Sequence, residues 1–262
     1  MASLIYDFPS DKQTGTWTSD GTVDTSYPLT NIDDERPWKP VKFTVNPTRI
    51  KCDRGSAKRT DVVSFIHCNF DAGAVIKVQF NATDAWGGPT VNQTLTIPAV
   101  AEDGQPGNPF IDFTDKAGYT ASGLRWLSIE ITSGQSTLLS LGLVRVSGLK
   151  RQPDPNIAHD VVKREWHEVL EPIRFGLGYG LGTRNRQWAG AFRYRTEAQF
   201  TSLLSWSRAA YGPWKPFLFI LDPSVNESAW VKWDGPLFES TYTYLKQTVS
   251  IIFNEVLRGL KP

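Results

Sequence analysis

One group of side chains that could carry out acid–base chemistry is an acidic run in the stretch YPLTNIDDERPWKP, residues 27–40. Asp33, Asp34 and Glu35 follow one another directly. Glycosidases use two carboxylates several ångströms apart on either side of the sugar bond. Acids are also common in exposed β-turns, and nothing in this sequence singles out a catalytic pair. We therefore predict that the run is not catalytic.

The same run has a simpler interpretation as a structural turn. Asn and Asp side chains accept hydrogen bonds from nearby backbone N–H groups, so Asn31, Asp33 and Asp34 are expected to cap the backbone here. Pro37 and Trp38 would then close one end of a β-sandwich with their apolar rings. We expect this segment to be mainly a structural turn, and only secondarily part of the rim of a ligand site.

Other catalytic and metal-binding patterns are missing from the sequence. Its three histidines do not form H-E-x-x-H or another recognised metal-ligand spacing, and G-x-S-x-G does not occur. Cys52 and Cys68 lie in strand-like stretches, and we expect buried free thiols rather than a disulfide, because cytoplasmic products seldom keep one. The sequence thus predicts a protein that is not an enzyme and needs no metal or cofactor.

Glycine recurs at every second position of one segment, at Gly176, Gly178, Gly180 and Gly182. The strand before and the helix after that would make this a phosphate-binding loop are not indicated. An extended segment with glycine along one face lets another backbone approach closely. It is either an arm that contacts a neighbouring subunit or an irregular loop.

Four arginines follow this segment and alternate with aromatic residues, at Arg184, Arg186, Arg193 and Arg195. Basic and aromatic side chains together are typical of single-stranded nucleic-acid surfaces. The whole chain of 262 residues has a formal net charge of only +1, however, which argues against a nucleic-acid partner. We expect ion pairs across a subunit contact, or a solvated strand face.

The elements that must position these residues are mainly β-strands. Residues 41–148 read as eight short β-rich runs separated by turns with Gly, Pro, Asp and Asn. In AVIKVQF, Ile76, Val78 and Phe80 alternate with more polar positions, as in a strand with one buried face. This half predicts an antiparallel β-sandwich or jelly roll.

A composition break with two prolines separates this half from the rest of the chain. We predict a sandwich over residues 1–149, a linker over 150–160 and a second β domain over 161–262. The second domain has one expected helix, 197–211, which begins with a T-x-x-Q capping box and packs on the sheet. The predicted fold is therefore mainly β, with a single α-helix.

Size and composition limit the function further. No run of ~18 apolar residues is present, so we expect no membrane insertion, and the N-terminus does not read as a signal peptide. Ten tryptophans are many for a chain of this length. Trp is large and orders at low entropic cost, so this enrichment suits interfaces and sugar-stacking surfaces as well as cores.

Four stretches in the first half resemble a known family. In order they are YPLTNIDDERPWKP, RTDVVSFIHCNFDAGAVIKVQF, GLRWLSIEI and LLSLGLVRVSG. They resemble the discoidin-like (F5/8 type C, galactose-binding-like) β-sandwiches found in bacteriophage virion proteins. The second half contains FRYRTEAQFTSLLSWSRAAYGPWKPFLFILDP and then AWVKWDG. This order resembles phage tail proteins of the distal-tail or tail-tip kind.

The resemblance implies a structural virion protein of a phage tail tip or baseplate, assembled in the host cytoplasm. Its C-terminal domain would form a ring, a hexamer or trimer, and contact other tail proteins such as the tube and hub. The glycine segment and the arginines would lie at that contact. The N-terminal sandwich would project outward and touch other tail proteins or host-surface glycans.

The alternative is a carbohydrate-binding protein, or an accessory module of a glycan-degrading enzyme. In that case Arg36, Trp38 and Trp86 would form a sugar platform at the loop end of the sandwich. Aromatic rings stack on sugar rings, while Arg and Asp bind hydroxyl groups. A tail-tip protein that touches the host surface could use the same platform, so the two hypotheses do not exclude each other.

Overall fold

The structure is a computed structural model of the chain. It describes residues 4–7, 14–98, 108–120, 122–152, 162–167, 184–194, 216–220, 228–234, 240–243 and 246–255. The chain forms two compact units. One contains residues 11–150 and 222–229, and the other contains residues 1–10, 151–221 and 230–262.

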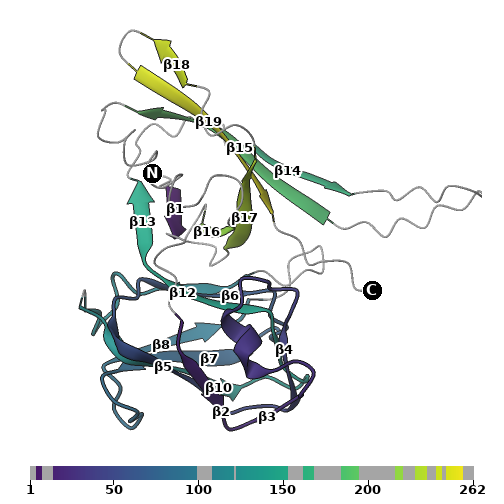
Figure 1. The fold of residues 1–262 in the computed structure, drawn as a ribbon, viewed down its shortest axis with the longest axis vertical. Helices are drawn as coiled ribbons and strands as arrows, with labels where there is room; N and C mark the ends of the chain where they lie inside the picture. Colours follow the sequence, from purple (N-terminus) through teal and green to yellow (C-terminus); the bar gives the residue numbers. More distant parts are fainter. Residues whose placement is uncertain are drawn as a thin grey trace, which may run out of the picture. The chain divides into compact units, whose positions relative to one another are not determined.

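The first unit is a β-sandwich (Figure 1). One layer is a five-stranded antiparallel sheet in the order β2 (Thr16–Ser19), β5 (Arg49–Lys58), β10 (Leu124–Ser133), β7 (Val75–Asn81) and β8 (Val91–Thr96). The other layer has two three-stranded sheets. The first has the order β11 (Ser140–Leu141), β4 (Val41–Val45) and β3 (Thr22–Val23). The second has the order β12 (Leu143–Ser147), β6 (Val62–Ile66) and β9 (Phe110–Asp112).

The core of the sandwich lies between these layers and follows strand alternation. Ile76, Val78 and Phe80 of β7 are buried and belong to the core, as the alternation in the sequence predicts. Phe80 packs edge-on against Phe113, with ring centroids 5.1 Å apart. The prediction of an antiparallel β-sandwich is confirmed.

Both cysteines are free and buried, as expected. Cys52 belongs to the core cluster, and burial raises the pKa of its thiol to about 12. A thiol in this state is a small apolar side chain and not a nucleophile.

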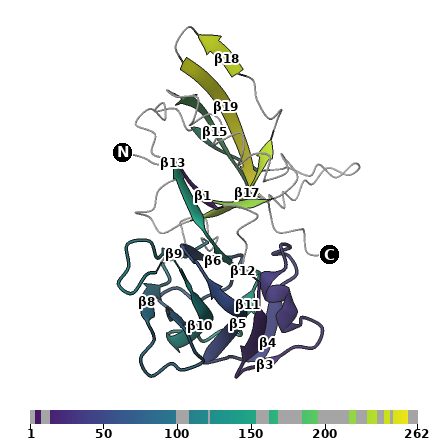
Figure 2. The same ribbon diagram turned by 60° about the vertical axis from the view of Figure 1, so that its left-hand side comes forward.

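The second unit contains a mainly antiparallel sheet in the order β13-β1-β16-β17-β19-β15-β14, with β18 also paired to β19. The bounds are β13 (Leu149–Gln152), β1 (Leu4–Asp7), β16 (Phe217–Ile220), β17 (Ala229–Asp234), β19 (Lys246–Glu255), β15 (Arg184–Tyr194), β14 (Val162–His167) and β18 (Ser240–Thr243). Figure 2 shows β15 and β19 running side by side. Their antiparallel register runs from Gln187 opposite Asn254 to Tyr194 opposite Gln247. The predicted helix 197–211 lies outside the described residues.

The division of the chain differs in part from the predicted boundaries. Residues 1–10 belong to the second unit, because β1 pairs with β16, with Ile5 opposite Ile220. Residues 222–229 belong to the sandwich, where the Ser228 and Ser64 hydroxyl oxygens lie 2.7 Å apart. Strand β13 also occupies the start of the predicted linker. These pairings join distant parts of the sequence, which local composition does not reveal.

The acidic run is a turn, and it is held only in part as predicted. Residues Leu29–Asp33 form a short 3-10 helix, η2. The Asp33 carboxylate accepts a hydrogen bond from the Trp17 indole at 3.2 Å, and Asp34 accepts from the Arg36 guanidinium. Asn31 donates its amide to the Pro40 carbonyl at 3.3 Å. The Asp34 carboxylate also accepts a hydrogen bond from the Arg36 backbone N–H, which lowers its pKa and fits the expected capping at this residue, whereas the contacts given for Asn31 and Asp33 are of another kind.

The prediction that Pro37 and Trp38 close one end of the sandwich is also only partly right. Pro37 is buried, but Trp38 is 45% exposed. The residue that fills the sandwich at this point is Ile32, which is fully buried in the core cluster. Glu35, the third acid, lies 3.7 Å from the buried guanidinium of Arg145 on β12.

Candidate functional site

The outer face of the five-stranded sheet carries an unusual set of side chains. Along β5, Ile50 and Cys52 point into the core, so Arg49, Lys51 and Asp53 point outward. On β10, Trp126 is directly opposite Asp53 and belongs to the same outer face. On β7, Asn81 is opposite Trp126 from the other side. Three neighbouring strands thus present a tryptophan between polar groups.

A second tryptophan reaches this face from the turn between β7 and β8. The Asn81 amide donates to the Ala85 carbonyl at 2.6 Å and accepts from the Thr90 hydroxyl at 3.0 Å, which closes residues 82–90 into a compact loop. The Trp86 indole donates to Asp84 at 2.7 Å, and the Arg49 guanidinium lies 5.7 Å from the centre of its ring. The loop therefore lies over the outer face of β5 and β10.

The charges on this face are arranged in three opposite pairs. Arg49 contacts Glu130 at 2.9 Å, Lys51 contacts Asp84 at 2.8 Å, and Arg125 contacts Asp53 at 2.6 Å. The last pair is bidentate, and the hydrogen bonds from Arg125 lower the pKa of the Asp53 carboxyl to about 2. Arg125 also lies 5.5 Å from the centre of the Trp126 ring. The six charged groups cancel and are held in fixed directions.

We call this set the tryptophan face. It consists of Trp86 and Trp126 with the ion-paired residues Arg49, Lys51, Asp53, Asp84, Arg125 and Glu130. Both indoles are half-buried. Exposed ion pairs of this kind contribute only about 0–1 kcal/mol each to stability. Their arrangement around two indoles is therefore better suited to binding than to holding the fold together.

Two buried polar atoms lie on the same side of the sheet. Ser128 and Gln79 alternate with core residues of β10 and β7, so their side chains point outward, yet both residues are buried. Ser128 Oγ and Gln79 Oε1 have no hydrogen-bond partner within the part of the chain that the structure describes. Buried polar groups of this kind are costly in a sheet that serves only as a scaffold.

The predicted platform residues lie in two places. Arg36 pairs with Asp34, and Trp38 follows it in the segment between η2 and β4. Trp86 belongs to the tryptophan face instead. The contacts found among residues 14–98 do not connect the two groups, so the three-residue platform stays a prediction. Trp126 was not predicted, because LRWLSIEI reads simply as a buried strand.

The predicted assembly residues are only partly described. Gly176, Gly178, Gly180, Gly182 and Arg195 lie outside the described residues. The backbone at Arg184, Arg186 and Arg193 is part of strand β15. The role of these residues in a subunit contact stays a prediction.

Neither a candidate metal cluster nor a helix suited to crossing a membrane is found within the described residues. Among them, no group of three or more His, Cys, Asp or Glu side chains is placed to hold a metal ion. No helix in the described ranges is long and apolar enough to cross a membrane.

No protein-family model and no curated protein matches this chain. Similar solved structures include CBM32-1 from a family 31 glycoside hydrolase of Clostridium perfringens, which is 10% identical, with 54% of this chain and 97% of that chain covered and a TM-score of 0.38. Chitosan-binding module 1 from a chitosanase/glucanase of Paenibacillus sp. IK-5 is 19% identical, with 52% and 96% covered and a TM-score of 0.36. CBM32 of AlyQ, in complex with 4,5-unsaturated mannuronic acid, is 16% identical, with 52% and 96% covered and a TM-score of 0.35. Scores under 0.5 say nothing about a ligand of this chain, and the comparisons do not support the predicted tail role.

Proposed function

We propose that this chain is a non-catalytic protein that binds a glycan through the tryptophan face. The observation that carries the proposal is the placement of two half-buried indoles on one sheet face, Trp86 and Trp126, each beside an oriented Arg–carboxylate pair. A sugar has an apolar face of C–H groups and a rim of hydroxyls. Indoles match the first, and fixed donors and acceptors match the second.

The pairing of charges supports a polar and uncharged surface of the ligand. Because Arg125 and Asp53 already neutralise each other, their remaining lone pairs and N–H groups can bind hydroxyls at a small electrostatic cost. The same argument applies to Lys51 and Asp84. A protein partner is the main alternative occupant, since Trp and Arg are also enriched at protein interfaces.

Affinity electrophoresis of the full chain tests the proposal. Native gels would contain a neutral β-glucan, chitosan or alginate, and each migration would be compared with that in a plain gel. We expect retardation in at least one polysaccharide gel, and its loss in Trp126→Ala and in Trp86→Ala. Circular dichroism of both variants would confirm that the β fold is retained.

Trp38→Ala is the matched control, because it removes an exposed indole outside the tryptophan face. Retardation that survives in both face variants would contradict the proposal. Loss in Trp38→Ala alone would move the site to the predicted Arg36–Trp38 segment. If none of the polysaccharides retards the wild-type protein, a protein partner is favoured.

We propose as a second role that the C-terminal unit takes part in an assembly, as a ring of identical subunits in a phage tail. The observation that favours it is an open sheet, in which β14 and β13 end the strand order among the described residues. Strands at the edge of a sheet can pair with another chain. Size-exclusion chromatography with light scattering should give a trimer or hexamer, and a monomer at all concentrations would exclude a ring formed by this chain alone.

A further inference from the structure

The outer face of the five-stranded sheet is buried at one point. Ser128 of β10 is 0% exposed and Gln79 of β7 is 4% exposed, although both alternate with core residues and point away from the core. The two residues are directly opposite each other in the register of β7 and β10. The outer face of an antiparallel sheet in a sandwich normally meets water, so another part of the chain covers this pair.

The loop between β7 and β8, residues 82–90, accounts for this cover. Asp84 of the loop contacts Lys51 of β5 at 2.8 Å. In the sheet, β10 lies between β7 and β5, and Lys51 is directly opposite Ser128. The contact between the loop and β5 therefore crosses β10 at the level of Ser128, and the loop and the Lys51 side chain form a layer over the buried pair.

The contacts that hold this loop on the sheet are weak. The ion pair between the loop and β5 joins two partly exposed side chains, and such pairs contribute little to stability. The Arg49 guanidinium lies 5.7 Å from the centre of the Trp86 ring, which is a modest attraction in contact with water. Apart from Trp86 and Pro89, every residue from 82 to 90 is exposed. The loop thus buries little apolar surface of its own.

Polar atoms under the loop lack partners. Ser128 Oγ and Gln79 Oε1 make no hydrogen bond to any residue that the structure describes. The Gln79 amide nitrogen donates only a long hydrogen bond, to Asn92 Oδ1 at 3.4 Å. A buried oxygen without a donor is costly, and water or a ligand removes that cost. The closed loop is therefore favoured by weak contacts and opposed by two buried oxygens, so we expect it to open readily.

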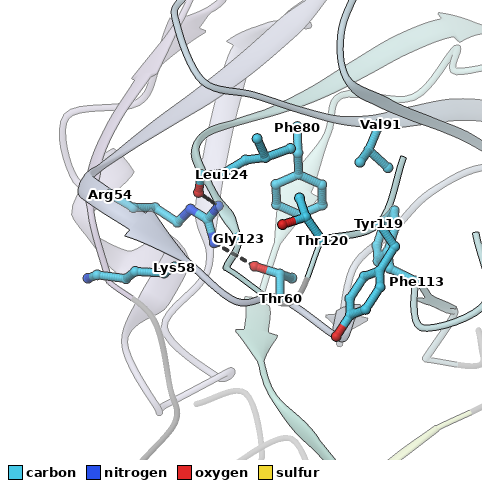
Figure 3. A pocket seen from close by; sticks show the side chains of 10 residues that line it. All are labelled: Arg54, Lys58, Thr60, Phe80, Val91, Phe113, Tyr119, Thr120, Gly123 and Leu124. Atoms are coloured by element: carbon cyan, nitrogen blue, oxygen red, sulfur yellow. Dashed lines mark hydrogen bonds between the residues drawn. The ribbon is translucent and has the colours of Figure 1, made fainter. Parts of the chain in front are cut away.

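A buried polar group on the inner side of the same sheet is treated differently (Figure 3). The Arg54 guanidinium donates to Thr60 Oγ1 at 2.5 Å and to the Leu124 carbonyl. The small pocket that Arg54 lines has a volume of about 20 Å³. This is room for about one or two water molecules and not for a sugar ring. Here the fold supplies oxygen partners to a buried polar group, which makes the unpaired oxygens under residues 82–90 informative.

We propose that residues 82–90 are a lid, and that Ser128 and Gln79 beneath it form a polar floor that binds hydroxyl groups of a glycan. The floor rests on the proposed function, whereas the lid does not. When the lid opens, the floor meets solvent beside Trp126, which precedes Ser128 by two positions on the same face of β10. A sugar hydroxyl donates to Gln79 Oε1 and accepts from Ser128 Oγ, so both unpaired oxygens gain partners.

Thiol labelling of the full chain without ligand tests the lid. Ser128→Cys places a thiol under the loop with almost no change in size, and the buried Cys52 and Cys68 are internal references for unfolding of the sandwich. Iodoacetamide labelling of each site would be followed by mass spectrometry of peptides. We expect the introduced thiol to react at least about tenfold faster than the two references, because it needs only local opening. Gln79→Cys is a second probe if Ser128→Cys does not fold.

Two matched aspartate variants show whether the loop controls this rate. Asp84→Asn removes the charge that pairs with Lys51, and Asp34→Asn removes a charge that pairs with Arg36 outside the tryptophan face. In the Ser128→Cys background, Asp84→Asn should raise the labelling rate by about two- to fivefold, the range for one exposed ion pair. Asp34→Asn should leave the rate unchanged.

Affinity electrophoresis tests the floor in gels that contain a neutral β-glucan, chitosan or alginate. Ser128→Ala and Gln79→Met each remove hydrogen-bonding atoms from the floor and leave both indoles in place. In a gel that retards the wild type, each variant should bind about three- to tenfold more weakly, as expected for the loss of one hydrogen bond. Trp38→Ala, outside the tryptophan face, should migrate like the wild type, and circular dichroism would confirm the β fold of each variant.

The outcomes separate the lid from the floor. Labelling of both introduced thiols as slowly as Cys52 and Cys68 would overturn the lid, and so would equal acceleration by Asp84→Asn and Asp34→Asn. Undiminished retardation of both Ser128→Ala and Gln79→Met would overturn the floor. If no polysaccharide retards the wild type, the floor fails together with the proposed function, while the labelling rates still decide the lid.

Discussion

Replacing Gly123 by alanine tests the close backbone contact between the turn before β10 and the end of β5. The residue has a φ of +76°, and an added Cβ would overlap the backbone carbonyl group of Lys58. The left-handed conformation alone costs a non-glycine residue about 1–2 kcal/mol. Forcing extra volume into a packed site costs typically a further ~1–3 kcal/mol. We expect Gly123→Ala to destabilise the sandwich by about 2–5 kcal/mol in total.

Gly55 provides a matched control, because it has nearly the same backbone conformation without the contact. Its φ is +74°, and nothing lies within 4 Å of the position that a Cβ would take. Gly55→Ala should therefore cost only the conformational part, about 1–2 kcal/mol. The difference between the two variants measures the contact with the Lys58 backbone.

Hydrogen exchange followed by mass spectrometry is the suitable assay, because the chain has two units and a single unfolding midpoint would mix them. Peptides from β5 and β10 report the sandwich alone, and each ~1.4 kcal/mol of lost stability makes globally limited exchange about tenfold faster. Gly123→Ala should accelerate exchange in these peptides far more than Gly55→Ala. Equal acceleration in both variants would refute the close approach of the β9–β10 turn to the end of β5.

Three further predictions concern single side chains. Hydrogen bonds from Arg125 lower the pKa of Asp53 to about 2. The Asp53 carboxylate should therefore stabilise the fold above about pH 4, and this contribution should be lost as the pH falls toward about 2. In an acid titration monitored by circular dichroism, Asp53→Asn should lose less stability over this pH range than the wild type. Cys52, with a pKa of about 12, should react with a thiol reagent such as dithionitrobenzoate only after denaturation, and rapid labelling of the native protein would contradict its burial. Asp33→Ala should cost about 1 kcal/mol because it removes the partner of the Trp17 indole, whereas Asp34→Ala should cost less than about 1 kcal/mol because its partner Arg36 is exposed; equal costs by denaturant unfolding would contradict the structure of this turn.

The sequence predicts those parts of the fold that depend on local patterns. Alternation from Val75 to Asn81 is a property of neighbouring residues, and the strand formed as expected. The free state of Cys52 and Cys68 also followed from composition and context. The pairing of β1 with β16 did not, because it joins segments more than two hundred residues apart and depends on the whole sheet.

The contrast between local patterns and long-range contacts also explains what could be predicted about the acidic run and the candidate site. A turn at residues 29–33 could be predicted from its composition, but Asp33 and Glu35 contact Trp17 on β2 and Arg145 on β12, which are distant in the sequence. Trp126 gave no signal of its own, because an outward position on a strand is set by register and not by residue type. Trp86 was identified as a ligand residue from its type, and only the structure shows that it lies over Arg49.

The polar, charged and indole side chains on the outer face of the five-stranded sheet indicate that this face is more than a scaffold. Ser128 and Gln79 are buried there with polar atoms that have no partner among the described residues, and apolar side chains at these positions would avoid that penalty. The three ion pairs beside them contribute little to stability. A face that needed only to stay soluble would not require two indoles between those pairs, since partly exposed apolar rings favour association. The combination is accounted for if the indoles and the pairs contact a ligand, which makes Trp86 and Trp126 the decisive residues to change first.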